Sequence, residues 1–299
     1  MELLKRVLTA LVLIPIVLLL VLRAPGPVLV FVTGVIALVA IHELLKLSVP
    51  YGIRPLQVPT YVFAAILFLL IAISPGPTPL LSTSAFALIA LSAAVLAPFI
   101  FLAIAMRRDE LSSSFPAALV SAFAFIYIAL PMASLAQLRE QWEGSFYLLY
   151  LLLLVWAGDI FAYFVGKSLG THRMSPRVSP KKTWEGAIAS LIASVAVGML
   201  MFHYAVPISS SLLHAHLIEL RDGIFTQPAS LFPVAILSTV LNVAAQFGDL
   251  VESLIKRGAG VKDSGAILPG HGGMFDRIDA LLFAAPVLWI YLSWRVLMQ

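Results

Sequence analysis

Long, nearly uncharged apolar runs dominate this sequence and decide what it can fold into. A helix needs about 20 mostly apolar residues to cross a bilayer. Nine segments come close to that requirement: 7–22, 27–45, 60–74, 82–106, 116–138, 146–166, 184–206, 231–251 and 280–297. Strands of a membrane barrel would instead alternate in polarity over about 10 residues. The sequence therefore predicts an all-α integral membrane protein, a polytopic bundle of about nine transmembrane helices.

The composition excludes several other classes of protein. Of the residues, 61% are hydrophobic and 11% are charged, whereas an ordinary soluble domain carries roughly 25% charged residues. Disordered chains need low hydropathy and high charge. The chain has no cysteine, which rules out disulfides, thiolate metal sites and thiol nucleophiles. The net charge of +4 does not indicate a nucleic-acid partner.

The distribution of basic residues predicts the orientation of the chain in the membrane. With the N-terminus in the cytoplasm, four of the 19 Lys and Arg residues fall outside: Arg23, Arg139, Arg221 and Arg295. The others fall inside, and the opposite orientation would invert this bias. Nine spans then place the C-terminus outside. We expect a multi-pass protein of the cell membrane, the inner or plasma membrane, with loops 167–183 and 256–277 in the cytoplasm.

The charge pattern also divides the chain into two halves. Residues 1–138 form about five spans that are nearly free of internal charge, apart from His42 and Glu43, for which helix-end packing is the favoured interpretation. Residues 139–299 form about four spans in which acidic, basic and Gly-rich stretches enter the helices and their cytoplasmic loops. We therefore expect the catalytic half to be 139–299.

Two of the predicted spans carry polar side chains at helical spacing. Steps of 4, 4, 3, 4 and 3 residues place six of them on one face of span 231–251 and its extension: Ser238, Asn242, Gln246, Asp249, Ser253 and Lys256. Span 146–166 has a similar stripe: Trp156, Asp159, Tyr163 and Lys167. A hydrogen-bonded helix seam explains Asn and Gln, but not a membrane-embedded Asp249, because ionisable groups inside a span are costly and usually functional. Asp159 and Asp249 together suggest a cation site or a proton path.

The most informative stretch is 253–279, which follows span 231–251. Gly270, His271, Gly272 and Gly273 can let backbone amides converge into a nest for anions. Four cations bracket this nest: Lys256, Arg257, Lys262 and Arg277. Asp276 and Asp279, one helical turn apart, offer the oxygen ligands that Mg²⁺ uses alongside substrate phosphates. These parts are those of metal-assisted phosphoryl or nucleotidyl transfer, although each alone is weak evidence and the segment is alternatively a turn between two spans.

The loop between spans 146–166 and 184–206 is basic as well. It contains Lys181 and Lys182, and its end reads Ser179-Pro-Lys-Lys-Thr-Trp-Glu-Gly186. Ser-Pro favours a turn, and Thr183 is expected to cap the next helix. On charge alone, the loop is equally well explained as a topology signal that touches anionic headgroups.

Residues 253–279 resemble the signature of the CDP-diacylglycerol synthases, or phosphatidate cytidylyltransferases, of the bacterial type. The matching positions are Ser253, Lys256-Arg257, Lys262-Asp263, His271-Gly272-Gly273 and Asp276-Arg277-Ile278-Asp279. Ser179–Gly186 and Asp159 with Ala162-Tyr163 resemble further family stretches. The resemblance covers roughly residues 150–286, and within 253–279 there is no departure from the family pattern.

The resemblance implies that the chain condenses CTP with phosphatidic acid, giving CDP-diacylglycerol and pyrophosphate for phospholipid synthesis. It implies Mg²⁺ held by Asp249 and Asp276, with a second cation left open, and places Lys256 and Asp279 in the catalytic set. The residues expected to bind substrates are Asp159, Lys181, Lys182, Arg257, Lys262, His271, Gly272, Gly273 and Arg277. Membrane lipids are the other expected partners, no nucleic acid is expected, and a homodimer is left open.

Two alternatives compete with this interpretation. CDP-alcohol phosphotransferases carry four aspartates and a Gly-x-x-x-Asp step on two helices, which we do not find in this sequence. An ion- or proton-coupled transporter that uses Asp159 and Asp249 would explain the polar stripes. It would not explain the His-Gly-Gly segment with its four cations.

Overall fold

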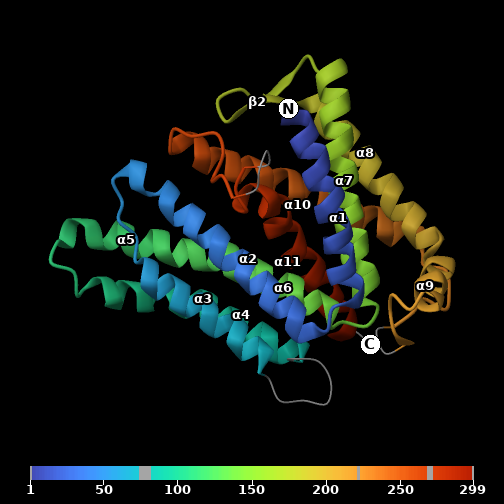
Figure 1. Cartoon of the computed structure of the whole chain (residues 1–299), viewed down its shortest axis with the longest axis horizontal. Coiled ribbons are helices and arrows are strands. Elements are labelled where there is room, and N and C mark those ends of the chain that lie inside the picture. The colour runs from blue at the N-terminus through green and yellow to red at the C-terminus, as the bar shows by residue number, and fades with distance from the viewer. Residues whose placement is uncertain (1, 74–81, 221–222, 268–271, 298–299) are drawn as a thin grey trace. The chain divides into compact units, whose positions relative to one another are not determined.

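The computed structural model describes residues 2–73, 82–220, 223–267 and 272–297. Nearly all regular structure in these ranges is helical (Figure 1). The helices are α1 (Glu2–Arg23), α2 (Gly26–Leu47), α3 (Gln57–Ala72), α4 (Thr83–Ala105), α5 (Leu111–Ala124), α6 (Leu130–Arg139), α7 (Gly144–Ser168), α8 (Trp184–His203), α9 (Ala205–His214), α10 (Leu231–Gly258) and α11 (Phe275–Leu297). A 3₁₀ turn, η1 (Val49–Tyr51), follows α2, and a π-helical turn, η2 (Phe125–Ala129), joins α5 to α6.

The predicted apolar segments are all helical. Among the described residues, six stretches are long and apolar enough to cross a membrane: Gly26–Tyr51, Thr83–Ala105, Leu111–Arg139, Gly144–Ser168, Trp184–His203 and Leu231–Gly258. Leu11–Arg23 and Gln57–Ala72 are shorter apolar helices. An all-α, polytopic membrane protein is confirmed, while the count of nine spans and the side on which each terminus lies stay predictions.

The structure differs from the sequence prediction in two local details and confirms a third. The predicted span 184–206 ends sooner, because α8 stops at His203 and the separate helix α9 begins at Ala205. The predicted loop 167–183 contains an antiparallel hairpin of β1 (Arg173–Ser175) and β2 (Ser179–Thr183). The hairpin leads directly into α8, where Thr183 Oγ1 accepts a hydrogen bond of 3.2 Å from the amide of Gly186, so its predicted capping role is confirmed.

The chain divides into two compact units. Unit 1 comprises residues 1–13, 25–137 and 255–278, and unit 2 comprises residues 14–24, 138–254 and 279–299. The division into functional halves at 138 stays a prediction. The signature segment, however, groups with the N-terminal helices, because residues 255–278 belong to unit 1.

Unit 1 is built from α2, α3, α4 and α5, which pack on one another and on η2. Its core consists of large apolar side chains with almost no exposed surface, among them Ile41, Leu45, Ile71, Phe101 and Phe125. Residues 255–278 add the last turn of α10, a connecting loop and the first turn of α11 to this unit.

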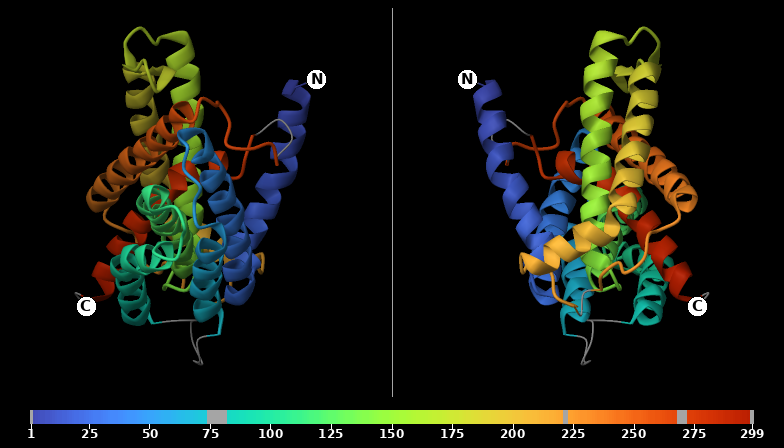
Figure 2. Two further views of the ribbon diagram at one scale, coloured as in Figure 1. Left: turned by 90° about the vertical axis from the view of Figure 1, so that its left-hand side faces the viewer. Right: turned by 90° about the vertical axis from the view of Figure 1, so that its right-hand side faces the viewer.

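Unit 2 is organised around the pair α7 and α8, which lie side by side, with the β1–β2 hairpin at one end of the pair (Figure 2). Buried polar groups join α10 to this pair. The Tyr150 hydroxyl lies 2.8 Å from Ser238 Oγ, and Asn242 Nδ2 donates to Ser190 Oγ at 2.9 Å and to Ser194 Oγ at 2.8 Å. Polar groups in an apolar surrounding are stable when they are paired in this way, so the inner part of the predicted α10 stripe is a helix seam.

Candidate active site

The outer part of the α10 stripe opens into a pocket of about 710 Å³ within unit 2. The stripe changes character at Gln246, whose Nε2 donates to Asn242 Oδ1 at 2.6 Å and to the carbonyl of Ala187 at 3.2 Å, and which also lines the pocket. Three further elements contribute to the wall: the C-terminal half of α7, the hairpin and the first turns of α8. The charged residues that line the pocket are Asp159, Lys167, Arg173, Lys181, Lys182 and Asp249.

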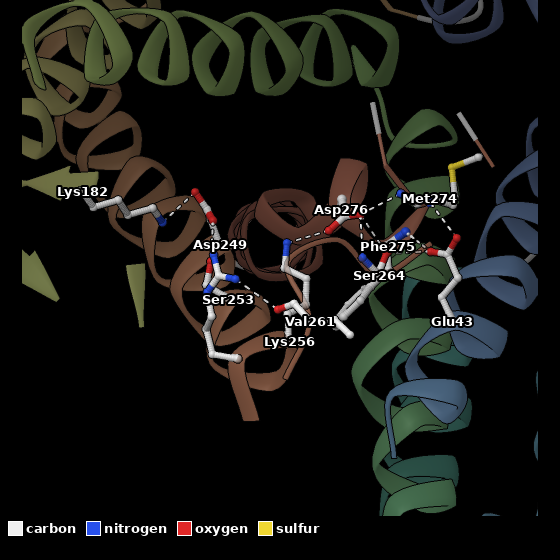
Figure 3. A network of polar contacts seen from close by, with 12 residues as sticks. Glu43, Lys182, Asp249, Ser253, Lys256, Val261, Ser264, Met274, Phe275 and Asp276 are labelled. Carbon is white, nitrogen blue, oxygen red and sulfur yellow. Dashed lines mark hydrogen bonds and ion pairs between the residues drawn. The ribbon is translucent and has the colours of Figure 1, made fainter. Parts of the chain in front are cut away.

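The pocket thus gathers four cationic side chains around two carboxylates. Lys182 Nζ lies 2.6 Å from Asp249 Oδ2, the one ion pair that is drawn within unit 2 in Figure 3. The Lys182 side chain is 26% exposed and that of Asp249 is 38% exposed, so both can also reach a ligand in the pocket. Lysine and arginine at this density favour a polyanion such as a chain of phosphates.

An acidic triad shares Asp249 with the pocket. One carboxylate oxygen from each of Asp249, Glu252 and Asp279 lies within 4.8 Å of the other two, and the Glu252 side chain is buried. Asp249 and Glu252 are three residues apart on α10, and Asp279 comes from α11. Hard oxygen ligands at this spacing fit a divalent cation such as Mg²⁺. The chemistry and the spacing of these three side chains are therefore suited to a metal site.

A second polar cluster lies in unit 1, at the start of α11. Asp276 is 9% exposed, and its Oδ1 accepts a hydrogen bond of 2.6 Å from Lys256 Nζ. Its Oδ2 accepts from the amides of Gly273 at 2.7 Å and Ser264 at 2.9 Å. Figure 3 shows Asp276 and the neighbouring Glu43 on either side of Ser264. Asp276, expected to be a metal ligand, is therefore held by a lysine and two backbone amides.

The backbone conformation of Gly272 and the surroundings of Gly273 explain why these positions of the signature are glycine. Gly272 has a φ of +79°, a left-handed conformation that glycine adopts without strain. A Cβ at Gly273 would lie 2.2 Å from Ser264 Oγ and 2.5 Å from Glu43 Oε2. The amide of Gly273 meets the carboxylate of Asp276, so within the described residues the anion that it binds belongs to the protein.

The structure brings the predicted site residues together in two groups. Asp159, Lys181, Lys182, Asp249 and Asp279 belong to unit 2, and Lys256, Arg257, Lys262, Gly272, Gly273, Asp276 and Arg277 belong to unit 1. Arg257, Lys262 and Arg277 are exposed, and Arg257 Nη1 donates to the carbonyl of Val261 at 3.1 Å. His271 lies outside the described residues.

The sequence analysis missed one acidic residue, Glu252, and the partners of a second, Glu43. Glu252 follows Asp249 by three residues, a helical step that places both on neighbouring positions of one face. Glu43 was interpreted as helix-end packing, and it does contact a helix end, that of α11. Nothing in the sequence near Glu43 indicates a partner more than 200 residues away.

The fold and the site together define a polytopic helical membrane protein with a basic pocket and an adjoining acidic triad, a class suited to chemistry on phosphate-bearing substrates. The chain belongs to the cytidylyltransferase family, whose family model matches residues 4–294.

Individual relatives agree with this assignment. A phosphatidate cytidylyltransferase of Staphylococcus aureus (strain COL) is 33% identical over 287 residues, covering 96% of this chain and 98% of that protein. Proteins of the same name from Brucella abortus biovar 1 (strain 9-941) and Haemophilus influenzae are 39% and 35% identical over 166 and 170 residues. These two matches cover 55% of this chain and 54% of each relative, so the chain spans about half the length of those relatives.

Proposed function

We propose that this chain is a phosphatidate cytidylyltransferase of a bacterial cell membrane. It joins CTP to phosphatidic acid, and the products are CDP-diacylglycerol and pyrophosphate. The observation that carries the proposal is the pocket of unit 2, in which Lys181 and Lys182 of the stretch Ser179–Gly186 line the same cavity as Asp249 of α10. Family membership and the names of the relatives support it.

The charges of the pocket suggest how it serves this reaction. Lys167, Arg173, Lys181 and Lys182 bind the phosphates of CTP, and a site on helices that cross the membrane can also receive a lipid phosphate. Holding both substrates in line converts a bimolecular step into an effectively unimolecular one. A phosphate oxygen of phosphatidate attacks the α-phosphorus of CTP, the bond from that phosphorus to the bridging oxygen breaks, and pyrophosphate leaves. No covalent enzyme intermediate is needed.

We place Mg²⁺ at Asp249, Glu252 and Asp279, because their oxygen atoms already converge. When bound, the ion neutralises charge that develops on the phosphates. Asp276 is the other candidate ligand, but its two oxygen atoms are engaged by Lys256, Ser264 and Gly273. Lys256, Arg257, Lys262, His271 and Arg277 are proposed to bind phosphate groups from the signature segment.

A direct assay tests the proposed function. Purified protein in detergent micelles is given CTP, Mg²⁺ and phosphatidate, and both pyrophosphate and lipid-bound cytidine are measured. We expect both products in equal amounts, and only when all three components are present. A transporter that used Asp159 and Asp249 would release neither product, and membership of the cytidylyltransferase family does not favour a transporter. Absence of both products from folded protein would reject the proposal.

A further inference from the structure

Glu43 is a buried carboxylate near the C-terminal end of helix α2, whose other ionisable residues are His42 and Lys46. It is 3% exposed, and it accepts hydrogen bonds from the amides of Met274 at 3.1 Å and Phe275 at 2.8 Å. Ser264 Oγ lies 3.0 Å both from Glu43 Oε2 and from Asp276 Oδ2, so its single proton is shared between the two carboxylates. An ionised carboxylate away from water is costly unless it is hydrogen-bonded. Its partners all lie in the signature segment, more than 200 residues along the chain.

The contact falls on the beginning of α11. The first amides of a helix have no acceptor within the helix, and a negative charge near them is favourable. Met274 and Phe275 are the last residue before α11 and its first residue, and Glu43 accepts from both amides. Asp276, which holds Lys256, is the next residue. A shift of Glu43 would therefore shift the turn that carries Asp276.

Two further contacts within unit 1 fix the same segment. Phe275 is fully buried, with its ring against that of Tyr127 in the π-helical turn η2, at a centroid distance of 6.0 Å. The Tyr51 hydroxyl, in η1, donates to the carbonyl of Ile255 at 3.1 Å, in the last turns of α10. Segments α2, η1 and η2 thus contact the described parts of this segment, at Ile255, Ser264, Met274 and Phe275. π-helical turns such as η2 are rare and are frequently found at functional sites.

We propose that Glu43 is a positioning residue for the proposed reaction, which fixes the start of α11 and so the Lys256–Asp276 pair of unit 1. The inference rests on the proposed function, because it assigns the residue a part in that reaction. A misplacement of about 1 Å can lower the rate of an enzyme about 100-fold. The N-terminal half of the chain is then a working part of the enzyme, and not a membrane anchor alone.

The test is Glu43→Gln, which keeps size and shape. One oxygen becomes an NH₂ group, so a donor must face either the Met274 amide or the Phe275 amide. We expect kcat to fall about tenfold or more, because hydrogen bonds to a charged group are lost. We also expect the Mg²⁺ concentration for half-maximal activity to rise. Amide hydrogen exchange at Met274 and Phe275 should become faster, and this readout needs no activity.

A matched control comes from the same helix. Thr33 is also buried on α2, but its hydroxyl donates to carbonyl groups of that helix, those of Leu29 and Val30. Thr33→Val should keep wild-type kcat and Mg²⁺ dependence. Should Glu43→Gln fail to fold, Glu43→Asp is judged by the same criteria, because it keeps the carboxylate but withdraws it by one methylene group from the amides of Met274 and Phe275.

The outcomes separate the two proposals. Wild-type kcat, Mg²⁺ dependence and exchange rates in Glu43→Gln would overturn the positioning role, as would equal changes in Thr33→Val. A loss of folded protein with unchanged kinetic constants in the remainder would also overturn it. A wild-type protein that makes no CDP-diacylglycerol would reject the proposed function instead, while the exchange measurement would still decide whether Glu43 holds the start of α11.

Discussion

Replacing Asp249 with asparagine should separate the chemistry of the acidic triad from the stability of the fold. The change keeps the shape of the side chain and removes one negative charge. It breaks the ion pair with Lys182, but both side chains are partly exposed, so the loss is at most about 1 kcal/mol. It also relieves repulsion within the triad. At an effective dielectric constant of about 20, two ionised carboxylates 4.8 Å apart repel by about 3.5 kcal/mol.

Without metal, these two effects predict that the Tm of Asp249→Asn lies either above that of the wild type or at most about 4 °C below it. Added Mg²⁺ should reveal the difference. A ligand at about 100 times its Kd stabilises the folded state by about 2.7 kcal/mol, which corresponds to about 5–10 °C in Tm. The wild type should show this shift and Asp249→Asn should not, while pyrophosphate release falls by orders of magnitude.

Both measurements are made on purified protein in one detergent, with EDTA or with Mg²⁺. Asp109→Asn is the control, since it removes an exposed carboxylate from the connection between α4 and α5. It should keep the turnover and the Mg²⁺-dependent shift of the wild type. An Asp249→Asn variant that retained both would refute our placement of the metal on this residue.

Three other predictions concern the glycine segment, the topology and pH. Gly273→Ala should lower Tm by several degrees, because its Cβ has no room and overpacking costs about 1–3 kcal/mol; an unchanged melting curve would contradict the packing described. Cysteines at Ser175 and Ala266 should resist an impermeant thiol reagent in intact cells, whereas one at Gln227 should react, and the reverse pattern would invert the topology. Burial raises the pKa of Glu143 from 4.5 to about 7, so its stabilising effect is complete below about pH 4.5 and is lost as the pH rises through 7. The wild type should therefore lose more Tm between pH 5 and 8 than Glu143→Gln, and parallel curves would exclude this residue as the cause.

The helices could be predicted from the sequence because hydropathy alone indicates where they form. A run of about 20 apolar residues has few alternatives in a bilayer, since each backbone group must find its partner within the segment. The details that escaped prediction depend on other forces. The hairpin 173–183 is short and polar, and the π-helical turn at Phe125–Ala129 follows from packing and not from composition.

The candidate site was partly predictable for a similar reason. Residues on one face of a helix can be recognised by their spacing in the sequence. In the structure, the stripe from Ser238 to Asp249 divides into a buried helix seam and a part of the pocket wall. Glu252 is compatible with the same spacing, but a single acid near a membrane surface carries no signal of its own. Contacts between distant segments, such as that of Glu43 with Phe275, leave no trace in local pattern.

The glycine-rich segment shows that a motif can correctly predict an anion-binding set of amides without identifying the anion. Glycines allow amides to converge on an anion, but spacing alone does not say whether that anion is a substrate or a side chain of the protein. At Gly273 the acceptor is Asp276, and the adjoining amides of Met274 and Phe275 point to Glu43. The acceptors of these three amides are thus two carboxylates of the protein itself. Arg257, Lys262 and Arg277 of the same segment are exposed, and their binding of substrate phosphates stays a prediction.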